Sequence, residues 1–320
     1  MNKVYLENII HLLNKLENTQ DNIIDQVADI CAECIYNDGM LYFFGTGHSH
    51  MICEEPFYRA GGLACIYPIL ETDLMLHEGA SKSSRYERLE GLGNIVVANT
   101  NLSKGDVLFL VSNSGRNCAV IDAAMEAKKR GAITVAITSM DHTTKVTSRH
   151  SSGLNLYQVC DYVLDNGGEL GDASVELVGL GQKIAPTSSV LDITLVNLIL
   201  VNTVERLLKK GIKPPVFMSA NTDAGDEANQ NILNMKPSGI RRFTALAKAT
   251  PGCKMLTIGE PDFDTPEPIR AAAAEAMAQG LTHYAPNKGT DSLRKAIADY
   301  ETKRGMACTM DNILVTVGAS

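Results

Sequence analysis

The chain has 320 residues, of which 45% are hydrophobic and 21% charged, and its formal net charge is -8. This length accommodates one large α/β domain with an additional segment, or two modest domains. Acidic and basic residues are interleaved, so no basic stripe is available to neutralise the phosphates of a nucleic acid, and we expect no nucleic-acid partner.

The N-terminal residues 1–20 lack the basic start and the unbroken apolar stretch of a signal peptide. The most apolar region, 189–204, is interrupted by Asp192, Asn197 and Asn202 and is shorter than the roughly 20 apolar residues that cross a bilayer. We therefore predict a cytoplasmic protein with no membrane partner.

The order of the predicted elements indicates the fold. Apolar residues recur at spacings of three and four over 6–16 and 23–34, which predicts two amphipathic helices before any strand. Short apolar runs then alternate with helical patterns, as is typical of parallel βαβ units. The predicted strands are 41–44, 64–67, 107–111, 133–137 and 162–164, and the helices among them begin near His50 and cover 119–129 and 190–210. The prediction is an α/β fold, a doubly wound parallel sheet of about five strands with N-terminal helices.

A polar, acidic stretch after Pro214–Pro215 is typical of a linker. We predict a domain over 1–228, a linker over 229–237 and a separate segment over 238–320. In that segment the patterns predict three helices and a strand, at 238–249, 267–279, 292–303 and 313–317.

Glycines and hydroxyls follow the first predicted strand, in a segment that we call loop 1: Gly45, Thr46, Gly47, His48 and Ser49. Glycine lets the backbone approach an anion, while hydroxyls and a following helix N-terminus donate hydrogen bonds to it. Tight packing is the alternative explanation for such a glycine-rich turn.

A second segment, loop 2, repeats this chemistry directly after the strand 107–111: Ser112, Asn113, Ser114, Gly115, Arg116 and Asn117. Loops at the carboxyl ends of parallel strands lie at the edge where ligands bind, so the two loops together predict a phosphate-binding site. Thr138 and Ser139 end the next strand, and Thr187 and Ser188 open the last helix. We predict that all four bind substrate, with helix capping as the alternative for the last pair.

With these loops the sequence resembles the SIS (sugar isomerase) family over about 1–228, whose members bind phosphosugars through a glycine–serine loop and an SxSG loop. The segments GTGHSHMICEEPFYRAGG, TSRHSSG and DNGGELGDASVE are most similar to an uncharacterised branch of single-domain members related to phosphoheptose isomerase. The resemblance implies a flavodoxin-like fold, a phosphosugar partner and a homodimer with the N-terminal helices at its interface. It implies no cofactor for this domain.

The reaction is open between isomerisation through an enediol, an etherase or lyase reaction, and sensing without turnover. An isomerase needs a base near the sugar and a second acid–base group. The candidates are Glu54 and Glu55 on the helix after loop 1, His48 and His50 around Ser49, and His150. Solvated carboxylates and plain hydrogen-bonding histidines are the alternatives. No helix-turn-helix pattern precedes the domain, which favours an enzyme over a transcriptional sensor.

The histidines match no metal-ligand spacing, and the single close cysteine pair, Cys31 and Cys34, has no second pair to complete a zinc site. We therefore predict no metal site and reduced, packed thiols.

Residues 238–320 resemble the N-terminal part of a class I pyridoxal phosphate aminotransferase, through PSGIRRFTALAKATPG, THYAPNKGTDSLRKAI and ILVTVGAS. The resemblance implies that Tyr284 would reach a cofactor phosphate in a partner subunit and that Gly318, Ala319 and Ser320 would begin the phosphate cradle. In that family the Schiff-base lysine lies further along the chain. The resemblance thus implies an incomplete pyridoxal phosphate site and an inactive segment.

Overall fold

The computed structural model describes residues 3–222, 265–280 and 288–316, together with residues 225, 228–230, 232, 282 and 286. The chain divides into two compact units, Met1–Ser238 and Gly239–Ser320. Each unit is described by itself.

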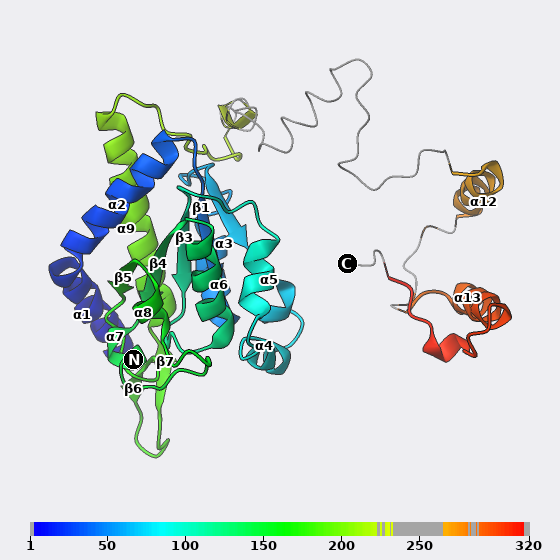
Figure 1. The fold of residues 1–320 in the computed structure, drawn as a ribbon, viewed down its shortest axis with the longest axis horizontal. Coiled ribbons are helices and arrows are strands. Elements are labelled where there is room, and N and C mark those ends of the chain that lie inside the picture. Colours follow the sequence, from blue (N-terminus) through cyan, green and yellow to red (C-terminus); the bar gives the residue numbers. More distant parts are fainter. Residues whose placement is uncertain are drawn as a thin grey trace. The chain divides into compact units, whose positions relative to one another are not determined.

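A five-stranded parallel sheet forms the centre of the first unit (Figure 1). Its strands, in spatial order, are β2 (Ile66–Ile69), β1 (Leu41–Gly45), β3 (Val107–Val111), β4 (Ile133–Thr138) and β5 (Tyr162–Asp165). All four pairings are parallel, so the predicted fold class and the five predicted strands are confirmed. The strand order reverses at β1, which lies between β2 and β3; this flavodoxin-like order places ligands at the β1/β3 switch point.

Each strand buries alternate residues on opposite faces of the sheet. Leu41 and Phe43 of β1 belong to one hydrophobic cluster, while Tyr42 and Phe44 belong to the other. Because successive side chains of a strand point to opposite faces, an unbroken apolar run requires a covering layer on each side.

Helices supply both layers, as Figure 1 shows. The first layer consists of α1 (Val4–Thr19), α2 (Asp21–Tyr36), α3 (His50–Glu54) and α9 (Ser188–Lys209). The second consists of α5 (Leu92–Ala98), α6 (Cys118–Lys129) and α8 (Leu156–Val159). The two N-terminal helices and the helices after β3 and before the linker were predicted at these places.

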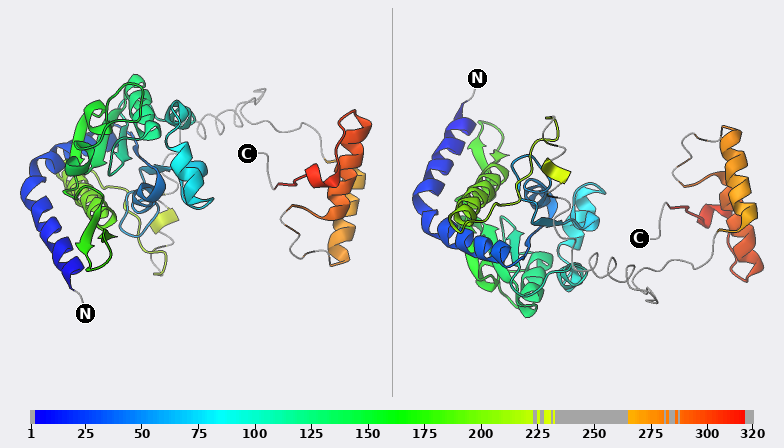
Figure 2. Two further views of the ribbon diagram at one scale, coloured as in Figure 1. Left: turned by 90° about the horizontal axis from the view of Figure 1, so that it is seen from below. Right: turned by 90° about the horizontal axis from the view of Figure 1, so that it is seen from above.

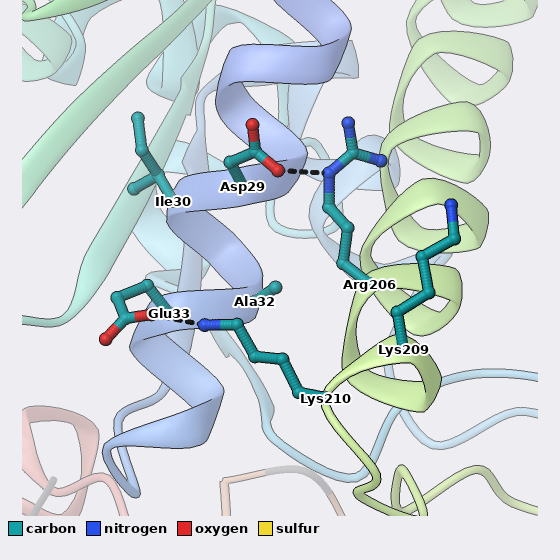
Figure 3. Close-up of a pocket in the computed structure, with 7 residues that line it drawn as sticks. All are labelled: Asp29, Ile30, Ala32, Glu33, Arg206, Lys209 and Lys210. Atoms are coloured by element: carbon teal, nitrogen blue, oxygen red, sulfur yellow. Dashed lines mark hydrogen bonds and ion pairs between the residues drawn. The ribbon is translucent and has the colours of Figure 1, made fainter.

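Helix α9 lies against α2, far away in the sequence, and Figure 2 shows the blue N-terminal helices beside it in both views. Arg206 of α9 forms an ion pair with Asp25 of α2 at 2.8 Å. Figure 3 shows two further pairs, of Arg206 with Asp29 and of Lys210 with Glu33. Exposed pairs of this kind contribute at most about 1 kcal/mol each. The buried apolar residues between the two helices therefore account for most of the attachment.

Some elements differ from the sequence-based expectation. The predicted helix near His50 is a short 3₁₀ turn, η1 (Gly47–Ser49), followed by α3, which ends at Glu54. Pro56 has no N–H for the carbonyl of Ile52, so this helix does not continue. The structure also contains η2 (Thr72–Leu74), α4 (Ala80–Tyr86), α7 (Met140–Thr143) and an antiparallel hairpin of β6 (Ala173–Glu176) and β7 (Lys183–Pro186), none of which was predicted.

The second unit contains α12 (Glu267–Ala278), α13 (Asp291–Lys303) and the turn η3 (Met310–Asn312). The two helices confirm predictions, whereas the strand expected at 313–317 is wrong over 313–316, which contain no strand. Arg294 of α13 explains this, because its guanidinium binds the carbonyls of Met310 (2.6 Å) and Ile313 (3.1 Å) and holds the segment along the helix. The expected helix 238–249, Tyr284 and 318–320 lie outside the described residues.

The cysteine pair of α2 lies inside the first hydrophobic cluster. Both thiols are free and buried, and burial raises the pKa of Cys31 and brings that of Cys34 to about 12. Such thiols are unreactive because the thiolate is the nucleophile. Among the described residues, no helix is long and apolar enough to cross a membrane.

Candidate functional site

Loop 1 turns tightly at the end of β1. A Cβ on Gly45 would lie 2.7 Å from the carbonyl oxygen of Ser49, so glycine is required where the loop folds back on itself. The Oγ1 of Thr46 donates to the Oε2 of Glu87 at 2.8 Å, while His48 is exposed and Ser49 half-buried. Loop 1 therefore presents polar groups beside a carboxylate that sequence analysis did not select.

Loop 2 is organised around Gly115, whose φ is +59° and whose Cβ would lie 2.8 Å from the Oγ1 of Thr143. The N–H of Gly115 donates to the Oγ of Ser112 at 3.2 Å. The hydroxyl of Ser114 has no hydrogen-bond partner in the described part of the chain. Asn117 accepts a hydrogen bond of 2.6 Å from Arg149 and directly precedes α6.

The pairing of β1 with β3 brings the two loops together. Gly45 is in register with Val111, so loop 1 and loop 2 leave adjacent strands at the same level of the sheet. This is the switch point described above, and the juxtaposition predicted from the sequence is present.

Arginines make the surroundings of loop 2 positively charged. The Nε of Arg116 is buried without a hydrogen-bond partner among the described residues. Burial, followed by the charges of Arg116 and Arg88, lowers the pKa of Arg149, and Glu87 opposes this shift. Guanidinium groups with unused donors favour an anion, because a phosphate supplies both the charge and the acceptors that they lack.

A buried chain of amides and a carboxylate connects loop 2 to β5 and α9. Asn166 donates through its Nδ2 to the Oδ1 of Asn113 at 3.0 Å and to the Oδ1 of Asp192 at 2.8 Å. Two residues at the end of β4 connect it to these groups. Thr138 donates to the carbonyl of Asn113 in loop 2 at 3.1 Å, and Ser139 donates to the carbonyl of Gly168 after β5 at 2.5 Å. Thr138 and Ser139 are fully buried, so in this structure they support loop 2 from behind.

Asp192 is the ionisable group among these hydrogen-bonded side chains. Burial raises its pKa to about 7, the hydrogen bond from Asn166 acts in the opposite direction, and the charge of Asp172 adds to the increase. A carboxyl group of this pKa exchanges a proton near neutral pH.

Thr187 and Ser188 lie where α9 begins. The carboxylate of Asp172 accepts hydrogen bonds from the N–H and hydroxyl of Ser188, at 2.8 and 2.7 Å, and from the N–H of Thr187 at 3.1 Å. The side chain of Thr187, the N-cap residue, makes no capping hydrogen bond, and Asp172 supplies the capping oxygens in place of the pair.

The predicted catalytic residues fall in different places. His50 and Glu54 lie directly after loop 1, with the Nε2 of His50 3.8 Å from the Oε1 of Glu54. Glu55 forms an ion pair with Arg59. His150 contacts α6 instead, because its Nε2 lies 3.1 Å from the Oδ1 of Asp122.

Of two surface pockets in the described part of the first unit, the one beside β5 adjoins the site and the one between α2 and α9 does not. A surface groove of about 550 Å³ between α2 and α9, lined by Arg206 and Lys210 among others (Figure 3), lies at the C-terminal end of α9. It is about 27 Å from Ser188, since 18 residues of helix rise 1.5 Å each. A polar hollow of about 480 Å³ beside β5 includes Gly168, and three lysines line it: Lys15, Lys145 and Lys183. This second hollow adjoins the buried hydrogen-bonded residues behind loop 2, and two of its lysines are paired with acids that also line it, Lys145 with Asp141 and Lys183 with Glu169.

Comparison with known proteins identifies the class. Residues 4–139, which include both loops, match the family model described as SIS domain, and residues 253–320 match the model described as aminotransferase class I and II. Residues 4–139 of the first unit are therefore identified as an SIS domain, as the loops indicated.

The curated relatives define the family more closely. A UPF0309 protein of Caldanaerobacter subterraneus subsp. tengcongensis is 41% identical over 75% of this chain and 99% of its own length. A UPF0309 protein of Halalkalibacterium halodurans is 42% identical over 70% of this chain and 92% of its own. The chain belongs to the UPF0309 family.

Solved structures with some similarity include phosphoheptose isomerase GmhA from Neisseria gonorrhoeae, at 17% identity and a TM-score of 0.39, covering 62% of this chain and 93% of that one. Another is the Vibrio vulnificus NanR protein complexed with ManNAc-6P, at 15% identity and a TM-score of 0.42, covering 73% of this chain and 69% of that one.

Sequence reasoning missed four residues of the site: Glu87, Asn166, Asp172 and Asp192. Asp192 carried a usable signal, because an acid within an otherwise apolar helix requires a buried partner. Glu87 lies within an ordinary charged run, and its contact with Thr46 joins residues 41 positions apart.

The raised pKa of Asp192 predicts a stability difference that depends on pH. An unfolded aspartate has a pKa of about 3.9. Between this value and 7 the folded chain retains a proton that the unfolded chain releases, so the stabilisation is complete below pH 4 and is lost as the pH rises through 7. We expect Asp192→Asn, which keeps an acceptor for Asn166, to be more stable than the wild type above pH 7 by at most about 4 kcal/mol.

Urea unfolding of both proteins at pH 5 and pH 8 measures this effect. The difference in the free energy of unfolding should be larger at pH 8. An equal difference at the two pH values would show that Asp192 does not titrate in this range.

Proposed function

We propose that this protein binds a sugar phosphate between loop 1 and loop 2 and interconverts its aldose and ketose forms. The observation that carries the proposal is that two glycine–hydroxyl loops of an SIS domain meet at the β1/β3 switch point of a parallel sheet. Ligands of such sheets bind at this point.

Loop 2 is the proposed phosphate site. The hydroxyl of Ser114 and the Nε of Arg116 have no partner among the described residues, and the N–H groups around Gly115 belong to a tight turn. A phosphate accepts hydrogen bonds from all three kinds of donor, and the nearby charges of Arg88 and Arg149 favour its anionic form.

Glu87 is the proposed base. It is half-buried, and its Oε2 receives the hydrogen bond from Thr46 in loop 1, which leaves Oε1 to face a ligand. In the proposed reaction the carboxylate removes the proton from C2 of the aldose, and an enediol forms. The same group returns the proton to C1, while a second proton moves between O1 and O2. His48, exposed in loop 1, is the group proposed to move that second proton. The proposed reaction requires no cofactor.

Sugar phosphates should raise the melting temperature of the chain, because a ligand that binds only the folded state stabilises it. We expect Ser114→Ala to reduce this increase while leaving the unliganded melting temperature unchanged, since the Ser114 hydroxyl has no partner to lose. Ser103→Ala is the control for the ligand-induced increase, because Ser103 precedes β3 at the opposite end of the same strand, although this substitution also removes the hydrogen bond from the Ser103 hydroxyl to Asp106. Differential scanning fluorimetry across C5 to C7 aldose and ketose phosphates provides the measurement. Absence of stabilisation by every compound would refute phosphosugar binding.

Isomerisation should also exchange the C2 proton of a bound aldose phosphate with solvent. In deuterated water we expect loss of the C2 proton signal by NMR, and we expect Glu87→Gln to slow it at least 100-fold, as loss of a general base slows catalysis by about 10²–10⁴-fold. Glutamine still accepts the hydrogen bond of Thr46, so loop 1 keeps its support. Glu90→Gln is the control. Binding without any exchange would show a sensor instead of an isomerase.

We propose in addition that the chain forms a homodimer through its N-terminal helix layer. Large apolar side chains are exposed there, with Leu6 at 58% and Ile10 at 50% on α1 and Val201 at 68% and Leu208 at 57% on α9. Exposed apolar patches commonly mark association surfaces. Light scattering should give twice the 34.5 kDa chain mass, and Leu6→Asp with Val201→Asp should reduce it to one chain. A wild-type monomer at micromolar concentration would overturn this proposal.

A further inference from the structure

Three potential metal ligands converge beside loop 1. They are His50 and Glu54, one turn apart on α3, and His77, which follows η2. One ligand atom from each lies within 4.8 Å of the other two. Neither the phosphate site nor the acid–base groups proposed above use this cluster.

The ring of His50 is oriented as a metal ligand requires. Its Nδ1 contacts the carbonyl oxygen of Gly47, which can only accept a hydrogen bond, so Nδ1 carries the proton. In the neutral imidazole the lone pair is therefore on Nε2, which faces Glu54 at 3.8 Å. Histidines that bind metals commonly donate their other N–H to a carbonyl or carboxylate, and this fixes both the tautomer and the ring plane.

The other two ligands can close around an ion. His50 is buried, with 4% exposed, and its ring contacts the edge of the His77 ring at a centroid distance of 5.0 Å. Ligand atoms around tetrahedral zinc lie about 3.3 Å apart, given Zn–N distances of about 2.0–2.1 Å. Glu54 and His77 are exposed. Side-chain rotation of these two residues supplies the remaining movement, while His50 stays in place.

We propose that His50, Glu54 and His77 bind one divalent transition-metal ion of the zinc type. Two imidazoles and one carboxylate favour zinc over magnesium or calcium, which prefer oxygen ligands. Three protein ligands leave the fourth tetrahedral position open to water or to an oxygen of a ligand at loop 1. This replaces the prediction of no metal site and is independent of the phosphosugar proposal.

Cobalt substitution tests the site in the full chain. After removal of metals with a chelator, Co²⁺ should bind with a stoichiometry of one and give the visible absorption of four-coordinate cobalt, and Zn²⁺ should displace it. The near-ultraviolet band of cobalt–thiolate bonds should be absent, which distinguishes this site from binding to the free cysteines. Calorimetry with Zn²⁺ measures the affinity.

The variants separate this cluster from its neighbours. We expect Glu54→Gln and His77→Ala, both at exposed positions, to weaken Zn²⁺ binding by more than the roughly 10–100-fold that follows loss of a hydrogen-bond partner behind a ligand. His48→Ala and Glu55→Gln, adjacent residues outside the cluster, should retain wild-type affinity. His50→Ala should abolish binding, with circular dichroism to confirm that it folds. Absence of stoichiometric binding to the wild type, or wild-type affinity in Glu54→Gln and His77→Ala, would overturn the proposal.

Discussion

The parallel pairing of β1 with β3 is the constraint on which the rest of this molecule depends. Both strands are buried on both faces, so their apolar residues require a helical layer on each side. The register that aligns Gly45 with Val111 also starts loop 1 and loop 2 at the same level. The pairing of β1 with β3 therefore determines both the hydrophobic core and the site. The apolar contacts that hold the two strands together also place the hydroxyl and glycine groups of the two loops beside each other.

The polar chain behind loop 2 shows how the site is held in shape. Hydrogen bonds hold loop 2 from behind: Thr138 donates to the carbonyl of Asn113, and Asn166 binds Asn113 on one side and Asp192 on the other. Burying an aspartate is unfavourable unless it is neutral or well hydrogen-bonded, and the raised pKa of Asp192 expresses that penalty. A series of hydrogen bonds restricts the conformation of a loop more than apolar contacts do, because hydrogen bonds depend on direction as well as distance.

The strands and helices that have a clear local hydrophobic pattern could be predicted from the sequence. Strands such as 107–111 are unbroken apolar runs, and α2 and α9 repeat at helical spacing, so both were visible without any tertiary information. The hairpin β6–β7 has only Val175 buried among eight residues, and no hydrophobic run identifies it. Glu87, Asn166 and Asp172 were missed for a different reason: their roles consist of hydrogen bonds to distant residues. His150 shows the converse, since its place in the segment TSRHSSG made it a candidate acid–base group, and its side chain instead contacts Asp122 of α6.

The histidine cluster illustrates the same limit at a single site. Metal-binding motifs in a sequence reveal ligands that share a helix or a short loop, so His50 is compared only with residues near it in the sequence. The third ligand follows β2, 27 residues further along, and reaches His50 only because β2 pairs with β1 and returns the chain to the same edge of the sheet. The tautomer of His50 depends in turn on the carbonyl of Gly47, which points at the ring because loop 1 turns tightly there. Loop 1 thus sets which nitrogen of His50 is free to bind a metal ion, and a metal ion at His50 would lie within a few residues of any sugar held by loop 1.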